Sequence, residues 1–348
     1  MLTSIGRFDI HEITRRHRTF WNRESCELPI FGVYPDRVRL PKGFLPRERR
    51  TLRPEDLDFE RLTDTLEGLL AIDGGLGMAP VAIPSWEIQW AELIMGCEIE
   101  TSDGNLWAKG IGDRERFLAE KTLLLDERWL DKLEDVFRTL DRHSNGRYLL
   151  SPSLIRGATD SLAALIGHEE MCLMMMDNPM DSSLLLGACT EAAIRISRRE
   201  LGMVPHPEGG NANRFGLWAP GETIVFQEDA AVLLSPALFE ELVLPWDVKM
   251  AESVEYPVYH LHSPCVSYVA PRLLEIDAVA AIQIRVDPVG PTMEELLPEF
   301  QRVQEKKPLI IGGNFSAADL AWLTDNLHPG WLEIIADRKS ILEFLAGR

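Results

Sequence analysis

The sequence is poor in cysteine and has no long apolar run. Its 348 residues include five cysteines, an odd number, and no CxxC pair. This pattern argues against a disulfide framework and indicates a reducing compartment. No segment approaches the ~18 apolar residues that span a bilayer, and the N-terminus has no apolar signal core. We therefore expect a cytoplasmic protein without a membrane partner.

Positive charge is scarce as well. Thirty-six Lys and Arg residues face 55 Asp and Glu residues, which gives a formal net charge of −19. Nucleic-acid binding requires a basic face, so we expect no nucleic-acid partner. An acidic exterior mainly favours solubility. The hydrophobic content of 45% is enough for a large core in a chain of this length.

Short β-branched runs alternate with amphipathic helices along the chain, and this alternation predicts a parallel sheet. Strand-like runs begin near residues 28, 78, 147, 223, 256, 278, 308 and 332. Eight such units predict an α/β fold of the (β/α)8 TIM barrel type. An open doubly wound sheet is the alternative, but no G-x-G-x-x-G turn follows any strand.

A helical segment around Ile10 to Asn22 precedes the first strand and predicts an N-terminal helical extension to the barrel. We expect one domain over residues 1–348. Residues 1–65 would hold the extension and the first strand, and residues 66–348 the remainder of the barrel.

Two histidines stand at the end of the apolar run from 256 to 261, just before Ser263-Pro264. His260 and His262 are two residues apart, so on one strand they point to the same face. Catalytic groups in (β/α)8 barrels lie at the C-terminal ends of the strands. The pair therefore predicts metal or acid/base chemistry, with two satisfied core histidines as the plain alternative.

Other polar and aromatic residues near strand ends are candidate site residues. Glu228 and Asp229 follow a buried strand, so at least one should face the barrel mouth, with a helix N-cap as the alternative for Asp229. Without a metal, His260 would carry protons with Glu228 or Asp229 as its partner. The candidate substrate-binding residues are Trp86, Glu87, Trp218, Asp287 and Asn314.

Several short motifs resemble the uroporphyrinogen decarboxylase superfamily. The acidic strand end Gln227-Glu228-Asp229-Ala230 is followed by Leu234-Ser235-Pro236-Ala237-Leu238-Phe239 and then by Leu244-Pro245. The superfamily typically has an acidic strand end, then L-S-P-x-x-F, then a proline one helix later. Residues 149–157 and Gly313-Asn314 match in the same order. The resemblance covers roughly residues 145–340 and implies the same barrel.

True uroporphyrinogen decarboxylases carry an arginine-rich R-Q-A-G-R loop after the first strand, and it holds the many carboxylates of the substrate. This chain has Val33-Tyr34-Pro35-Asp36 there, followed only by Arg37 and Arg39. These two arginines are too few to neutralise a tetrapyrrole with eight carboxylates. The family aspartate beyond the second strand is also missing, and Trp86 and Glu87 stand nearest. We do not expect porphyrinogen decarboxylation.

The chain is more similar to the corrinoid-dependent methyltransferases of the superfamily. These carry H-x-C-G at the end of the fifth strand, where this chain has His260-Leu261-His262-Ser263. The resemblance implies a methyltransferase that acts between a small methyl donor or acceptor and a cobalamin on a partner corrinoid protein. Members often pair, so it also implies a homodimer, although no motif here demands one.

The methyltransferases use a zinc ion held by a His and two Cys, whereas here His262 replaces the first Cys and Ala336-Asp337 stand in the strand-eight region. His260, His262 and one further ligand would still form a catalytic zinc site, because three protein ligands leave the fourth position open. Cys265, Glu228 and Asp337 are the candidates for that ligand.

Two other functions stay open. One is a decarboxylase of a smaller carboxylic acid, which would need an arginine in the pocket, and Arg156, Arg214 and Arg285 are the candidates. The other is an inactive barrel that serves as a binding subunit. Polar groups that do not converge at the strand ends would favour this second alternative.

Overall fold

A parallel sheet lies at the centre of the computed structural model, which describes residues 9–33, 40, 43–62, 77–84 and 88–348. Within these residues, seven strands follow the order β1-β12-β11-β10-β9-β8-β7, and every neighbouring pair is parallel. The strands are β1 (Ile30–Val33), β7 (Leu154–Arg156), β8 (Val225–Gln227), β9 (Val258–His262), β10 (Ala281–Arg285), β11 (Leu309–Gly312) and β12 (Leu332–Ala336).

A separate parallel pair joins β3 (Val81–Ala82) to β6 (Leu149–Leu150). Each of the eight predicted strand regions therefore contains a strand. The third region is divided into β6 and β7, with Pro152 between the two pieces. Proline lacks the N–H that a ladder needs, which explains the interruption. The α/β class is confirmed, whereas closure into an eight-stranded barrel stays a prediction.

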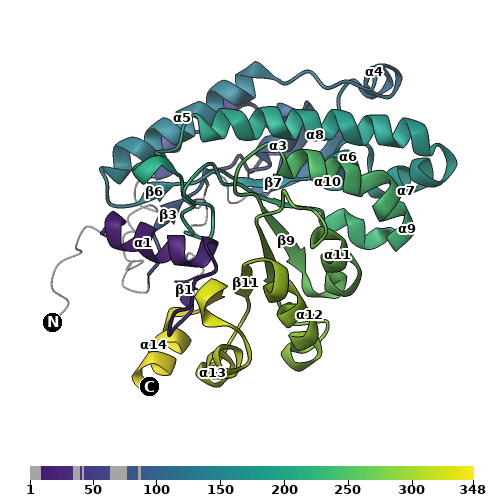
Figure 1. Cartoon of the computed structure of the whole chain (residues 1–348). Coiled ribbons are helices and arrows are strands. Elements are labelled where there is room, and N and C mark those ends of the chain that lie inside the picture. Colours follow the sequence, from purple (N-terminus) through teal and green to yellow (C-terminus); the bar gives the residue numbers. More distant parts are fainter. Residues whose placement is uncertain (1–8, 34–39, 41–42, 63–76, 85–87) are drawn as a thin grey trace.

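Helices follow the later strands on the outside of the sheet, as Figure 1 shows for the green and yellow half of the chain. Because helices cover the sheet, every residue of β11 and β12 is buried. Two of these helices begin with capping boxes, Thr292 with Glu295 and Ser316 with Asp319. The helices are α11 (Val266–Leu273), α12 (Met293–Lys306), α13 (Ala317–Asn326) and α14 (Arg338–Ala346).

The predicted N-terminal helix is present as α1 (Ile10–Trp21), capped by Asp9. Phe20 of α1 is fully buried against the N-terminal residues of several strands, among them Val225, Val258 and Ala281. The ring of His17 accepts a hydrogen bond from the backbone N–H of Trp218 at 2.8 Å. This helix therefore packs at the N-terminal ends of the strands, opposite the ends that carry the two histidines.

Residues 97–144 hold elements that the sequence analysis did not predict. Strands β4 (Cys97–Ser102) and β5 (Asn105–Ile111) form an antiparallel hairpin that also pairs with β2 (Arg50–Thr51). Helix α5 (Glu127–Ser144) follows it. A short helix, α3 (Trp90–Ile94), precedes the hairpin. No helix among the described residues is long and apolar enough to cross a membrane.

Candidate functional site

Strand register places the polar residues of the site in two rows. The first row runs Gln227, His260, Gln283, Ile310, Glu333 and Ile30, each residue paired with the next on the neighbouring strand. In the second row His262 pairs with Arg285. The His260 and His262 rings lie 5.0 Å apart with planes at 88°, as expected for neighbours on one face of a strand.

Asp229, His260 and His262 form a group that could hold a metal ion, called the metal-capable group below. One ligand atom from each of Asp229, His260 and His262 lies within 4.8 Å of the other two. Nε2 of His262 is 3.7 Å from Oδ1 of Asp229. A tetrahedral zinc ion with bonds of about 2.1 Å separates its ligands by about 3.4 Å, so a small contraction around an ion would suffice.

A hydrogen bond fixes the orientation of each imidazole. Nδ1 of His262 donates to both oxygens of Asp287, at 3.0 and 2.9 Å. Nδ1 of His260 bonds to the side-chain oxygen of Gln283. Carboxylate and amide oxygens only accept, so both Nδ1 atoms carry the proton and both Nε2 lone pairs are left for a metal.

Burial sets the protonation state of His260. Desolvation, and then the neighbouring His262, lowers the pKa of His260 to about 3, so this ring is neutral at neutral pH as a metal ligand must be. Desolvation, and then the charge of Asp160, raises the pKa of Asp229. Asp229 is therefore a carboxylate that a cation would stabilise.

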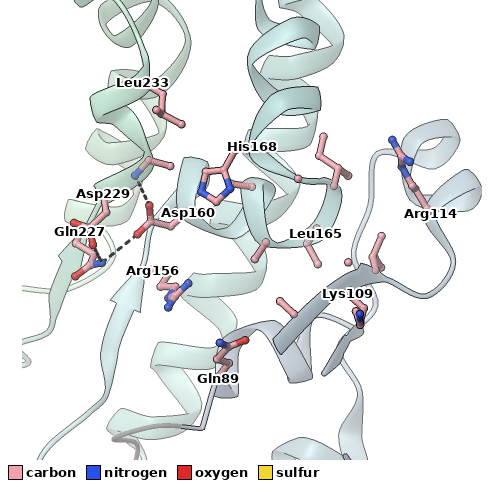
Figure 2. Close-up of a pocket in the computed structure, with 18 of the residues that line it drawn as sticks. Gln89, Lys109, Arg114, Arg156, Asp160, Leu165, His168, Gln227, Asp229 and Leu233 are labelled. Atoms are coloured by element: carbon pink, nitrogen blue, oxygen red, sulfur yellow. Dashed lines mark hydrogen bonds between the residues drawn. The ribbon is translucent and has the colours of Figure 1, made fainter. Parts of the chain in front are cut away.

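Gln227 joins Asp229 to Asp160. Its side-chain amide donates to Oδ2 of Asp229 at 2.5 Å and to Oδ2 of Asp160 at 3.2 Å, as the dashed lines in Figure 2 show. Asp160 also accepts the backbone N–H of Ala230 at 2.7 Å. These contacts fix Oδ2 of Asp229 on the Gln227 side, while Oδ1 lies nearer His262.

A cavity of about 640 Å³ opens beside the metal-capable group, and Gln227 and Asp229 form part of its wall. Helix α6 (Ala158–Ile166), the short helix η6 (Asp229–Leu233) and strand β5 line it (Figure 2). Its volume is in the usual range for small-molecule sites. Arg156, at the end of β7, also lines it.

Glu228 points elsewhere, although it was a candidate for catalysis and for the third metal ligand. Its carboxylate accepts the backbone N–H groups of Ala158 and Thr159, at 2.5 and 2.8 Å, and so caps the start of α6. A Cβ atom on Gly157 would lie 2.0 Å from Oε1 of Glu228, so glycine is what allows this approach. Burial, and then Asp247 and Asp160, raises the pKa of Glu228 well above its usual range.

Several predicted site residues lie outside the metal-capable group. Cys265 is buried in η8 (Ser263–Cys265), and Asp337 caps α14. Trp218 is fully buried, with its indole N–H donating to Pro207 at 2.9 Å, and Asn314 is exposed after β11. Trp86 and Glu87 lie outside the described residues.

The sequence analysis missed Gln227 and Gln283 as supporting residues. Both stand in the row of His260 on adjacent strands, so the signal was available once the strands had been aligned. Comparison with known proteins adds no further assignment, because neither a family model nor a curated protein matches the chain.

Proposed function

We propose that the protein is a zinc-dependent methyltransferase that moves a methyl group between a small substrate and a cobalamin carried by a partner protein. The zinc site in this proposal is supported by the convergence of Asp229, His260 and His262, with a hydrogen-bonding partner behind each ring. The corrinoid part comes from the resemblance of the His260-Leu261-His262-Ser263 segment to the methyltransferase motif.

The donor set fits zinc. Two neutral imidazoles and one carboxylate form a three-ligand site with an open fourth position, which is the pattern of catalytic zinc. Zinc bound there would hold the heteroatom of a methyl acceptor in its nucleophilic, deprotonated form. Asp287 and Gln283 would keep the rings oriented, and Asp229, the third residue that would hold the ion, also forms part of the wall of the cavity.

In the transfer from cobalamin, a lone pair on the acceptor heteroatom forms the new bond to the methyl carbon. The bond between carbon and cobalt breaks with its electron pair left on cobalt, and the proton of the acceptor passes to solvent. The transfer is therefore a nucleophilic displacement, which requires a deprotonated acceptor close to the cavity.

We also propose that β3 and β6 close the sheet into an eight-stranded barrel. The seven-stranded order follows the chain without reversal and brings β1 beside β12. A doubly wound sheet would reverse its order. A Cβ atom on Gly32 of β1 would lie 3.4 Å from Cε of Met78, just before β3, so the two regions are close.

A decarboxylase of a smaller carboxylic acid is the second candidate, since Arg156 lines the cavity. Release of carbon dioxide without methylcobalamin would identify it. The inactive-barrel alternative is less favoured, because polar groups do converge beside the strand ends.

The test combines metal analysis with turnover. We expect about one zinc ion per chain, a loss of most of that zinc in His260→Ala and His262→Ala, and demethylation of methylcobalamin with a thiol or amine acceptor. His11→Ala is the control, because His11 is an exposed histidine paired with Glu208. Unchanged zinc and unchanged turnover in both site variants would overturn the proposal.

A further inference from the structure

We infer that the cavity beside Asp229 binds a small monocarboxylate with an apolar body, and that Arg156 anchors its carboxylate. The inference rests on the proposed function, because it treats the cavity as the place of the small substrate. It adds the chemical class of that substrate and the residue that recognises it.

The cavity has one mainly apolar wall. Four consecutive residues of α6, from Ala163 to Ile166, line it, and so do Val232 and Leu233 of η6. Val232 and Leu233 are each 53% exposed, an unusual exposure for large apolar side chains next to a cavity. An apolar ligand would cover them, and burial of apolar surface is the main source of affinity in such sites.

Arg156 supplies the anion-binding group. Its Nη1 forms an ion pair of 2.8 Å with the carboxylate of Glu92, whose side chain is only 4% exposed. The Arg156 side chain is itself 42% exposed, so part of the guanidinium is open to the cavity. Glu92 therefore fixes Arg156 from the protein side, and a planar guanidinium binds carboxylates through paired hydrogen bonds.

The charge of the wall selects a monoanion. Besides Arg156, the Lys and Arg residues of the wall are Lys109, 3.6 Å from Glu100, and Arg114, which pairs with Glu170. Each of the three therefore has an acidic partner already, and Asp160 and Asp229 add negative charge. A phosphate monoester would add two negative charges to this wall, whereas a carboxylate adds only one and matches the planar guanidinium of Arg156 in shape.

The same charges orient the ligand. Asp229 would repel a carboxylate and Arg156 would attract it, so the charged end lies at Arg156 and the other end points to Asp229. Arg156 pairs in register with Gln227, and Gln227 binds Asp229, so the two ends of the site stand on adjacent strands. Figure 2 shows Arg156 and Asp229 among the residues that line the same cavity.

Calorimetric titration of the zinc-loaded protein with hexanoate, hexanamide and hexyl phosphate tests the assignment. We expect hexanoate to bind about tenfold or more tightly than either of the others, because a charge-assisted pair contributes that much. Hexanamide that binds as tightly as hexanoate would overturn the inference. Hexyl phosphate that binds more tightly would overturn the monocarboxylate class.

The decisive variant is Glu92→Gln/Arg156→Gln. Arg156→Gln alone would leave the buried Glu92 without its cation and would destabilise the fold, whereas the double variant removes both charges. We expect hexanoate binding to weaken about tenfold or more in the double variant, with an unchanged melting temperature. Arg114→Gln is the matched control, a cavity cation for which we expect less than about threefold loss.

Zinc content separates this inference from the proposed function. If the protein binds no zinc but still requires Arg156 to bind hexanoate, the result contradicts the proposed function and supports the anion site at Arg156. A zinc-loaded protein whose double variant binds hexanoate as tightly as the parent would overturn the inference alone.

Discussion

Asp287 accepts hydrogen bonds from Nδ1 of His262 through both of its carboxylate oxygens, at 3.0 and 2.9 Å. The N–H and hydroxyl of Ser263 also approach Oδ2 of Asp287, at 3.2 and 3.3 Å, so the carboxylate is itself held in place. A carboxylate behind a metal-bound histidine fixes the tautomer of the ring and raises the basicity of its other nitrogen.

Asp287→Ala is therefore expected to weaken zinc binding about 10- to 100-fold, the usual effect of removing such a partner. The measurement is zinc affinity by competition with a chromogenic chelator. Asp131→Ala, at an exposed position on α5, is the control. Equal zinc affinity in Asp287→Ala and the parent protein would contradict a supporting role for Asp287 behind a zinc-bound His262.

Much of the sheet could be predicted from the sequence, because buried parallel strands are short apolar runs that turn signals interrupt. The Asp103-Gly104 turn of the β4–β5 hairpin carried such a signal, since both residues have positive φ, as hairpin turns require. It was missed because the hairpin is not part of the alternating pattern. Trp107 stands on that hairpin and is 58% exposed.

The site was partly predictable. The spacing of His260 and His262 placed them on one face, and Asp229 was a candidate partner. The sequence could not tell which of Glu228 and Asp229 faces the histidines, because the chain leaves β8 irregularly at that point. The structure directs Glu228 to the start of α6 and Asp229 to His262. Gly157, which leaves room for the carboxylate of Glu228, was a local hint of the first contact.

Gly157→Ala tests how closely Glu228 packs against α6. The added Cβ would lie 2.0 Å from Oε1 of Glu228 and 2.7 Å from the backbone oxygen of Gln227. Overpacking of this kind costs about 1–3 kcal/mol, and we expect the upper end, because the displaced group is a buried acid. Chemical denaturation measures the free energy of unfolding.

Gly202→Ala is the control for that measurement, since its added Cβ would come no closer than 3.4 Å to the backbone oxygen of Arg199. The free energy of unfolding of Gly202→Ala should fall by less than about 1 kcal/mol, because the position has ordinary right-handed backbone angles. A Gly157→Ala variant as stable as Gly202→Ala would contradict the contact between Gly157 and Glu228.

The raised pKa of Glu200 predicts that the free energy of unfolding depends on pH. This side chain of α8 (Pro179–Leu201) is fully buried, and it accepts hydrogen bonds from the N–H and hydroxyl of Ser153, both at 2.8 Å. Burial raises its pKa to about 7 from an ordinary value of 4.5, and the bonds to Ser153 only partly oppose that rise. The folded state therefore holds a proton that the unfolded state has already lost above pH 4.5.

Because the folded pKa is the higher one, the contribution of Glu200 to stability is complete below pH 4.5 and is lost as the pH rises through about 7. Glu200→Gln keeps a neutral group that can accept from the N–H of Ser153 and donate to its hydroxyl. We expect this variant to match the parent near pH 5 and to be on the order of 2–3 kcal/mol more stable at pH 9. Denaturation at both pH values measures it, with the exposed Glu169→Gln as control. A difference between Glu200→Gln and the parent that stays constant from pH 5 to pH 9 would show that Glu200 is not protonated in the folded chain.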